Sequence, residues 1–266
     1  MDGIRVDIRI GNLEVLRCPG LWVDSERHRA LTRMGVVLPD PERDLFKAIV
    51  AGLSVEIRMG YRGENPGVWT GTVSHVEEGG TKDQIMIGVV GLERALVETR
   101  VTEAWVSESP EAVVAWAVSK AGMVAGRIDS PGVILPRVSA GDLSVWDLVR
   151  GLSVSCQKGF DVAMSSWALW VDDKGRVNWG DFDADGDGPT IESGALLIQH
   201  VPSGAGFDRH VVESFLIPGL RHSMLFTLKD VFRGVDGTFR ALRVRHEIGD
   251  DKARTFVWYG AEHEKY

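Results

Sequence analysis

The sequence lacks several features that define large classes of proteins. Its 266 residues include two cysteines, Cys18 and Cys156, too few for a disulfide framework and typical of a chain that folds in a reducing cytoplasm. No apolar run approaches the roughly 20 residues that cross a bilayer. Residues 1–20 lack a basic stretch followed by an apolar one, so we expect no signal peptide. These absences argue against a small secreted domain and against a membrane protein.

Positive charge is also scarce. The chain has 30 Lys and Arg residues against 38 Asp and Glu residues, and its net charge is −8. A surface that grips duplex nucleic acid needs a basic stripe, and the sequence shows none, so we expect no specific nucleic-acid binding. Apolar residues make up 44% of the chain, which is enough for a buried core and unlike a disordered composition.

Motifs for known catalytic chemistry are missing. None of the seven histidines has H-E-x-x-H spacing, and no nucleophile elbow, phosphate-binding P-loop or C-x-x-C pair occurs. A pair of carboxylates could cleave glycans, and Glu213, Asp230 and Glu247 are candidates in predicted strands. Solvated strand faces are the commoner place for such residues. We therefore expect no enzymatic activity, no catalytic site and no cofactor.

One acidic loop matches a metal-binding pattern. In DFDADGDGPTIE, residues 181–192, oxygen ligands fall at Asp181, Asp183 and Asp185, a glycine follows, and Glu192 stands at the twelfth position. This is the spacing of a calcium loop. An EF-hand also needs a helix on each side, and neither flank has a helical pattern. The sequence favours a solvated acidic linker without metal, and calcium held by a loop outside an EF-hand is the alternative.

Apolar residues alternate with polar ones through much of the first hundred residues, which predicts short strands. A short helix is expected within residues 39–53, after two prolines, and residues 19–38 show no clear pattern and are expected to be irregular. Several short strands at close spacing suggest a small barrel or sandwich. The expected strands are residues 4–10, 13–18, 54–61, 67–76 and 84–90.

The middle of the chain reads as α+β. Ser109 and Pro110 predict the start of a helix that ends near Gly122. A second helix is expected within residues 139–159, with Leu143, Trp146, Val149 and Leu152 on one face. A hairpin follows, in which Gly175 supplies the left-handed turn position.

The remainder reads as β again, with five strand-like runs after Gly194. The predicted fold is therefore mainly β, with two small barrel-like modules flanking an α+β insert. The predicted domains are residues 1–100, 101–185 and 186–266. Nine tryptophans are many for this length, and we interpret most of them as core residues and the rest as interface anchors.

Several short motifs resemble one known family. The motifs are Gly52 and, in residues 53–77, Val55, Glu56, Ile57, Gly60, Tyr61, Trp69, Thr70 and Gly71, then LIPGLRHSMLFTL in residues 216–228, and His246 and Thr255 in a closing hairpin. On these motifs the chain resembles the baseplate or tail hub proteins of long bacteriophage tails, a family of late-control-protein-D-like proteins. The order barrel, α+β insert, barrel also fits that family.

The resemblance implies a structural role in the virion tail for a chain made in the bacterial cytoplasm. Such hubs form a homotrimeric ring that joins the tail tube to the central spike or tip and to other baseplate proteins. Two similar modules per chain would let three chains meet a sixfold tube. Three copies would carry 3 × (−8) = −24 charges, and a negative channel would keep passing DNA from sticking. The alternatives are a hub of a contractile secretion or injection system, a glycan-cleaving tail enzyme, and a calcium-dependent binding module.

Overall fold

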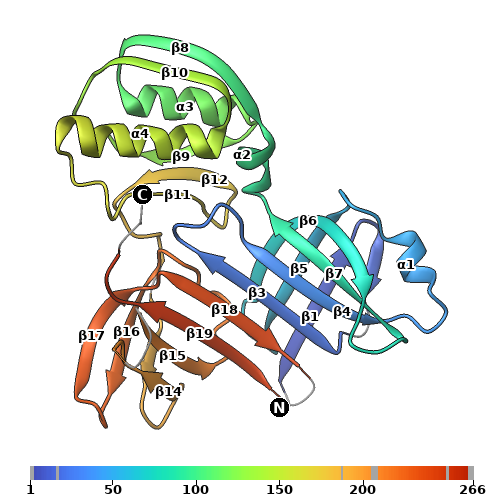
Figure 1. Cartoon of the computed structure of the whole chain (residues 1–266). Helices are drawn as coiled ribbons and strands as arrows, with labels where there is room; N and C mark the ends of the chain where they lie inside the picture. Colours follow the sequence, from blue (N-terminus) through green and yellow to red (C-terminus); the bar gives the residue numbers. More distant parts are fainter. Residues whose placement is uncertain (1–2, 16–17, 187, 205–208, 250–251, 263–266) are drawn as a thin grey trace. The chain divides into compact units, whose positions relative to one another are not determined.

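The computed structural model describes residues 3–15, 18–186, 188–204, 209–249 and 252–262. The protein is mainly β, as predicted, with a few helices (Figure 1). The chain divides into two compact units, which exchange segments several times along the sequence. Unit 1 contains residues 1–26, 31–91 and 183–261, and unit 2 contains residues 27–30, 92–182 and 262–266.

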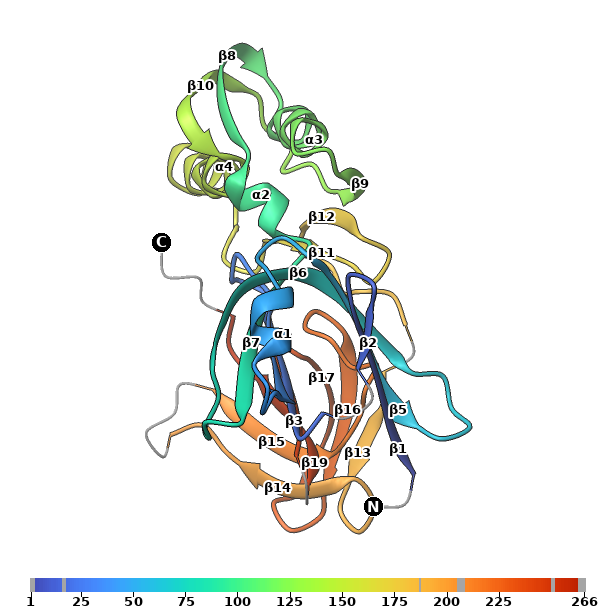
Figure 2. The same ribbon diagram turned by 90° about the vertical axis from the view of Figure 1, so that its right-hand side faces the viewer.

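Unit 1 is built on a single sheet of eleven antiparallel strands in the order β14-β15-β19-β18-β3-β4-β7-β6-β5-β1-β2. Seven strands come from the start of the chain and four from its end. Figure 2 shows how strongly the sheet curls. The early strands are β1 (Ile4–Ile10), β2 (Leu13–Val15), β3 (Gly20–Glu26), β4 (Arg33–Pro39), β5 (Ser54–Tyr61), β6 (Gly67–Glu78) and β7 (Gln84–Gly91). The late strands are β14 (Leu197–Val201), β15 (His210–Phe215), β18 (Arg243–Ile248) and β19 (Ala253–Tyr259).

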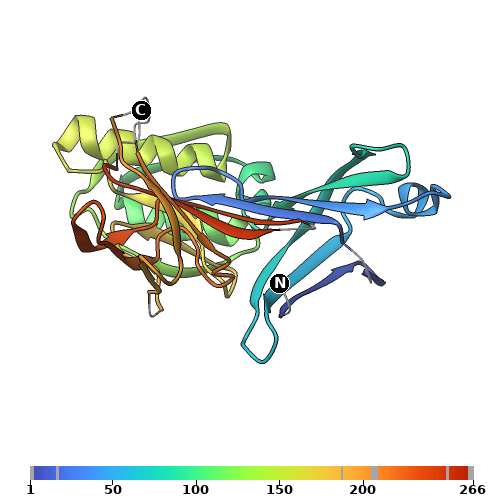
Figure 3. The same ribbon diagram turned by 90° about the horizontal axis from the view of Figure 1, so that it is seen from below.

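The two groups of strands meet where β3 pairs with β18. Six residue pairs hold this junction, from Leu21 opposite Ile248 to Glu26 opposite Arg243. In Figure 3 the early strands (blue) run into the late strands (red) without a break. A second, smaller sheet in the order β13-β16-β17 completes unit 1, with β13 (Thr190–Glu192), β16 (Leu225–Asp230) and β17 (Val235–Arg240).

Each group of strands nevertheless has its own core. Ile57, Ile87 and Val36 are fully buried in the core of the early strands. Val212 and Phe226 are fully buried in a separate core, between the late strands and the smaller sheet. In most strands buried side chains alternate with more exposed ones, because successive strand residues point to opposite faces. Unit 1 thus has two packed modules that share one sheet.

Unit 2 is α+β. A two-stranded ribbon, β8 with β10, and a three-stranded sheet, β11-β12-β9, surround two helices whose buried side chains form a third core. The elements of unit 2 are α2 (Arg94–Glu98), β8 (Arg100–Glu108), α3 (Pro110–Lys120), β9 (Val124–Ile128), β10 (Leu135–Ser144), α4 (Val145–Phe160), β11 (Ala168–Val171) and β12 (Arg176–Gly180).

Helix α3 begins where the sequence predicts, whereas α4 begins at Val145, later than residue 139, where the expected range begins. Ser109 caps α3, and its side chain accepts a hydrogen bond from Ala112 N, with Pro110 at the first helical position. Ser144 caps α4 in the same way, by accepting from Asp147 N at 3.0 Å. Leu143, which we expected on the buried face of this helix, instead lies in the ribbon strand β10, next to its last residue, and is 36% exposed, so that part of the prediction was wrong.

The expectation that residues 19–38 are irregular was also wrong, because they form β3 and β4. In β3 buried residues alternate with half-buried ones, so only one face is fully covered. In β4 Met34, Gly35 and Val36 are all buried, so no alternation marks the strand. A Cβ on Gly35 would lie 2.3 Å from Trp22 Nε1, so glycine is required for this close approach. The expected short helix is one turn, α1 (Asp44–Ala48).

The observed division differs from the three predicted domains. Residues 1–26, 31–91 and 183–261 form one unit, whereas the prediction separated residues 1–100 from 186–266. The physical reason is the β3–β18 pairing, which joins strands more than 200 residues apart and leaves no trace in local sequence pattern. The unit boundaries at residues 92 and 182 lie close to the predicted limits of the α+β insert, residues 101 and 185. No helix in the described residues is long and apolar enough to cross a membrane.

The cap of α4 gives a direct test of how unit 2 is stabilised. We expect Ser144→Ala to lower the free energy of unfolding by about 1 kcal/mol, because the Asp147 amide loses its acceptor at a buried position. Ser155→Ala is the matched control in the same helix, where the exposed hydroxyl donates to Gly151 O. Urea unfolding curves of both variants measure the difference, and equal stabilities would contradict the capping role.

Candidate docking surfaces

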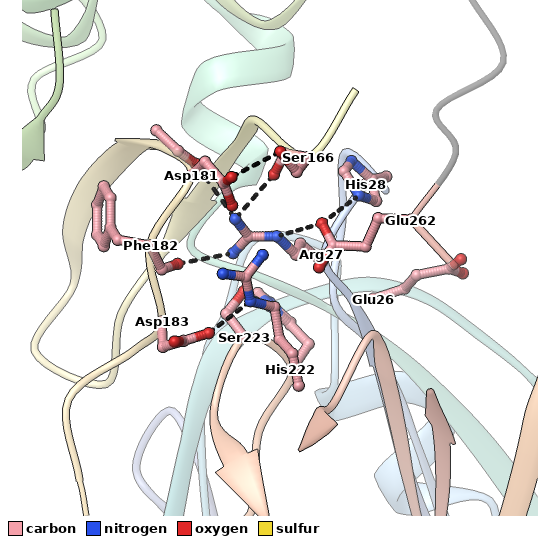
Figure 4. Close-up of polar contacts among 12 residues, drawn as sticks. Glu26, Arg27, His28, Ser166, Asp181, Phe182, Asp183, His222, Ser223 and Glu262 are labelled. Atoms are coloured by element: carbon pink, nitrogen blue, oxygen red, sulfur yellow. Dashed lines mark hydrogen bonds and ion pairs between the residues drawn. The ribbon is translucent and has the colours of Figure 1, made fainter. Parts of the chain in front are cut away.

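The structure separates the carboxylates of the loop 181–192. Asp181, in unit 2, accepts a hydrogen bond from Ser166 Oγ at 2.7 Å (Figure 4). Asp183, in unit 1, forms an ion pair with Arg240 instead of facing a cation site. Within the described part of the chain, no three His, Cys, Asp or Glu side chains lie close enough together to hold a metal ion.

The rest of this loop becomes part of a sheet. Asp185 is exposed, and Glu192 lies at an exposed position of β13. β13 runs parallel to β16, with Ile191 opposite Leu228 and fully buried in the core of the late strands. The loop is therefore a connection that leads into a short strand. The sequence analysis treated the whole segment as a linker and missed that strand.

The three acids considered for glycan cleavage do not converge. Glu213 and Glu247 lie on the same outer face of the large sheet, where each forms an ion pair with an arginine. Glu213 pairs with Arg254 at 3.4 Å, and Glu247 pairs with Arg245 at 2.7 Å. Asp230 is 1% exposed and lies at the end of β16 in the smaller sheet. Glu213 and Glu247, each paired with an arginine, form part of a charged face of the large sheet.

Asp230 instead belongs to a buried polar chain. His200 Nδ1 donates to Asp230 Oδ2 at 2.8 Å, and Tyr259 OH donates to His200 Nε2 at 3.0 Å. Burial acts to raise the pKa of Asp230, but the hydrogen bonds from His200 and the Arg233 backbone outweigh it and lower that pKa. Burial also raises the pKa of Tyr259 to about 12. Asp230, His200 and Tyr259 each have a hydrogen-bond partner, as in a structural network.

The residues that carry the family resemblance meet at one seam in unit 1. We define the seam as the loop 216–221 together with the side chains that hold it. Tyr61 OH donates to Leu216 O at 3.1 Å, and Thr255 Oγ1 accepts from Ile217 N at 2.8 Å. His246 Nε2 lies 2.9 Å from Leu220 O, and its Nδ1 lies 2.9 Å from Thr255 Oγ1. Since a carbonyl can only accept, Nε2 carries the proton and Nδ1 accepts from the threonine hydroxyl.

The early strands contact the same loop closely. The Arg221 guanidinium donates to Val68 O and lies over the Trp69 ring, 3.8 Å from its centroid. A Cβ on Gly67 would lie 1.9 Å from Pro218 O, so this strand residue has to be glycine. The Trp69 ring also meets the His246 ring edge to face at 5.5 Å. The seam thus joins the two modules of unit 1 through side chains that are far apart in sequence.

The outer face of the sheet at the β3–β18 junction is rich in arginine and aromatic residues. Arg243 pairs with Asp24 and lies over the Trp258 ring at 4.4 Å. Arg245 lies over the Trp22 ring at 5.2 Å. Arginine and tryptophan are the residues that contribute most at protein interfaces. This face is a candidate docking surface, and the sequence analysis did not single it out.

A signal for this docking surface was present in the alternation of residues along β19. In RTFVWY, phenylalanine and tryptophan stand between the buried residues, where a plain solvated face would carry polar residues. The same face continues to β15, where Arg254 lies over the Phe215 ring at 5.3 Å. Phe215 is 43% exposed. Strand pairing brings these residues together, and the sequence alone cannot show that β3 and β18 are neighbours.

A single buried arginine organises unit 2. Arg27 has no exposed side-chain surface, and its guanidinium donates to the carbonyls of Ser166, Gly180 and Phe182 at 3.1–3.2 Å (Figure 4). It also forms an ion pair with Glu262 at 3.5 Å. Arg27, Phe182 and Glu262 each stand where the chain enters or leaves unit 2. The arginine therefore ties together three chain crossings within that unit.

Most tryptophans pack in cores, as predicted. Trp69, Trp146, Trp170 and Trp179 are all buried. In unit 2 Trp105 meets Trp116 edge to face at 5.0 Å, and Trp167 meets Trp179 at 4.9 Å. The half-buried Trp22 and Trp258 are the ones on the outer sheet face.

Comparison with solved structures places this fold among tail proteins. The chain is similar to a tail protein from Neisseria meningitidis, with a TM-score of 0.71, 11% identity and coverage of 99% of this chain and 97% of that one. It is also similar to the 43 kDa tail protein of prophage MuSo2 from Shewanella oneidensis, with a TM-score of 0.72, 9% identity and coverage of 97% and 96%. The likeness thus extends over nearly the whole of all three chains.

A third similar structure comes from a secretion machine. It is an E. coli component of the type VI secretion system, described as structurally similar to the T4 bacteriophage tail proteins gp27 and gp5. The TM-score is 0.65 at 10% identity, over 97% of this chain and 77% of that one. No protein-family model and no curated protein matches the sequence. The chain has the fold of these tail proteins, which confirms the expected resemblance at the level of the fold.

The seam should make unit 1 sensitive to acid. Burial lowers the pKa of His246 from an ordinary 6.5 to about 4. Because the folded pKa is the lower one, the unfolded chain takes up the proton first, and stability is lost as the pH falls from about 6.5 to 4. At 1.36 kcal/mol per pKa unit, the loss at the acid end is on the order of 3 kcal/mol.

The control is His246→Asn, which cannot titrate in this range. We expect this variant to be less stable at pH 7 but to lose less stability on acidification than the wild type. Denaturant unfolding at a series of pH values measures both profiles. If the two proteins lose stability in parallel as the pH falls, the pKa of His246 is not lowered in the folded state.

Arg27 should be difficult to replace even by lysine. Arg27→Lys keeps the charge but loses the planar set of donors that reaches three carbonyls, so we expect a loss of about 2–3 kcal/mol in the stability of unit 2. Arg29→Lys, at an exposed position of the same loop, should change it by less than about 0.5 kcal/mol. Thermal unfolding followed by tryptophan fluorescence compares them, and equal effects would exclude the organising role of Arg27.

Proposed function

We propose that this protein is the tail hub of a phage or prophage. In this role it links the tail tube to the central spike or tip and surrounds the channel through which DNA leaves. The observation that carries the proposal is the likeness to two tail proteins over almost the full length of both chains, at TM-scores of 0.71 and 0.72. Proteins of such low identity that keep a similar fold over their whole length are under a common structural constraint.

The surfaces of the chain suit assembly. The outer face of the large sheet presents paired charges and aromatic side chains, with Trp22, Trp258 and Phe215 among them. Ion pairs such as Arg243–Asp24 hold these side chains in fixed positions before any partner arrives. Preorganised side chains lose little entropy on binding, which favours stable contacts between subunits. The partners we propose are further copies of this chain in a homotrimer, the tail tube, the spike or tip, and other baseplate proteins.

A hub that acts only through docking needs no reaction. The carboxylates considered for glycan cleavage are ion-paired on a sheet face or buried in a hydrogen-bonded chain. We therefore propose that the protein has no enzymatic activity. Its net charge of −8 supports a channel that does not bind DNA as it passes.

The second candidate is the corresponding hub of a contractile secretion or injection system. It is favoured by the likeness to the E. coli type VI secretion component, over 97% of this chain. The two candidates share the assembly mechanism and differ in what the tube delivers. The genes beside this one distinguish them, since a capsid and tail operon would accompany a phage hub.

Co-expression with the tube and spike proteins encoded beside this gene tests the proposal. We expect a complex of all three proteins, and we expect electron microscopy of it to show a threefold ring around a central spike. Peptidoglycan incubated with the complex should release no fragments. The proposal fails if no complex forms, and it fails in favour of an enzyme if fragments are released by the wild type but not by Glu213→Gln.

A further inference from the structure

Strand β17 has one open edge. The smaller sheet of unit 1 has the order β13-β16-β17, so β17 pairs with β16 on one side only. Figure 1 shows β16 beside β17 and no strand on the other side of β17. The unpaired edge of a strand is a template for pairing with another strand, and folded proteins usually protect it.

The register of the sheet shows which backbone groups point to that edge. Ala241, directly after β17, continues the same register, and its N–H donates to Met224 O at 2.9 Å on the β16 side. The direction of the backbone groups alternates along an antiparallel strand. The N–H and C=O groups of Asp236 and Thr238 therefore point away from β16. Within the described residues, no other segment forms a backbone hydrogen bond with these four groups.

The open edge is regular, and the core beneath it is incompletely covered. The strand VDGTFR contains neither lysine nor proline, and its six residue pairs with β16 include no bulge. Each of these features would hinder pairing with a further strand. Val235 and Phe239 point toward the core of the late strands but are only partly buried. One more strand beside β17 would cover both side chains and satisfy the open backbone groups.

The sequence of β17 is complementary to itself. When two copies run antiparallel with Thr238 opposite Thr238, Asp236 stands opposite Arg240 and Gly237 stands opposite Phe239. Opposite charges then face each other, and each large ring faces a residue that has no side chain. This register also makes Thr238 a hydrogen-bonded pair, as the outward direction of its backbone groups requires. A register centred on Asp236 or on Arg240 would place like charges opposite each other.

The charge contact adds to an interaction that already exists in each chain. Arg240 pairs with Asp183 of its own chain. A guanidinium has five N–H donors and can bind two carboxylates. Asp236 of the second copy would therefore join the Arg240–Asp183 pair without displacing Asp183. The backbone bonds at Thr238 hold the two strands together, and the charges select the register.

We infer that the free chain forms a two-fold dimer in which β17 pairs antiparallel with β17 of a second copy, with Thr238 at the axis. Such a contact is isologous, because the same surface serves both copies. The inference goes beyond the proposed function, since a two-fold pair lies outside a threefold ring. The dimer covers the open edges of chains that have not yet assembled and so protects them from uncontrolled strand pairing.

A proline at the axis tests the pairing. Thr238→Pro removes an N–H that points away from β16, and proline is tolerated on an edge strand at such a position. We expect it to raise the dissociation constant of the dimer at least about tenfold, because two hydrogen bonds across the axis are lost. Sedimentation equilibrium measures the constant, and circular dichroism with thermal unfolding checks the fold.

The matched control is Thr238→Val, which keeps the backbone N–H. Both variants lose the same hydroxyl contact with Thr227 Oγ1, at 3.2 Å, so they differ in the edge donor. The valine variant should dimerise as the wild type does. The inference is overturned if the wild type is a monomer at every concentration, or if the proline variant is folded and dimerises as well as the valine variant.

Cysteine cross-linking gives a second test, which does not depend on how the proline variant folds. The Cα atoms of a hydrogen-bonded antiparallel pair are about 5.5 Å apart, within the range of a disulfide. Thr238→Cys alone should therefore give a disulfide-linked dimer under mild oxidation. Thr227→Cys, one strand away on the same face, should not. The unmodified protein, with Cys18 and Cys156, is the background control, and equal cross-linking of both variants would contradict the pairing.

These tests are separate from the test of the proposed function. If the wild type dimerises and cross-links but forms no complex with the tube and spike proteins, the hub function fails and the β17 contact stands. If the complex forms but the free chain neither dimerises nor cross-links, the contact is overturned and the hub function stands. If the free wild type is a monomer and Thr238→Pro prevents the complex, the edge binds a different protein and the inference is overturned.

Discussion

The structure of unit 1 depends on the clamping of one short loop. The loop 216–221 lies between the late strands β15 and β16, and several of its backbone groups are bound by side chains from both groups of strands. Thr255 and His246 hold it from the late side, and Tyr61 holds it from the early side. Two modules with separate cores would otherwise be joined only along the β3–β18 edge. The seam adds side-chain contacts between the two modules to the backbone pairing of β3 with β18.

This junction explains the position of the charged and aromatic outer face. The strands that carry Trp22, Arg243 and Trp258 are neighbours only because β3 pairs with β18. The inner side of the same strands is closed by buried residues such as Val23 and Val244, both 0% exposed. The sheet can therefore present large side chains outward without losing its core. A docking protein needs this combination of a closed interior and a fixed, chemically varied surface.

Local features of the fold could be predicted from the sequence, and long-range pairing could not. Ser109, Pro110 and Gly175 stand at helix and turn positions that only a few residue types satisfy, so α3 and the β11–β12 hairpin were predicted correctly. β4 was missed because it is buried on both faces and lacks alternation.

The candidate site shows the same limit. The motif residues Tyr61, Trp69, His246 and Thr255 were recognised as a family pattern, but their meeting at one seam follows from the tertiary structure. The acidic loop shows the converse error of pattern reading. Its calcium spacing is complete, yet Asp183 pairs with Arg240 and the loop ends in a strand. Spacing along a chain does not determine which side chains converge, because the backbone path between them decides their direction.

The central claim is that the seam makes the early and late strands of unit 1 one cooperative structure. Native-state hydrogen exchange measures this most directly, because amides in β4 and β19 report on the two modules separately. As denaturant is added, the claim predicts that both sets of amides lose protection at the same free energy of opening. It is contradicted if the late strands open at a clearly lower free energy while the early strands stay protected.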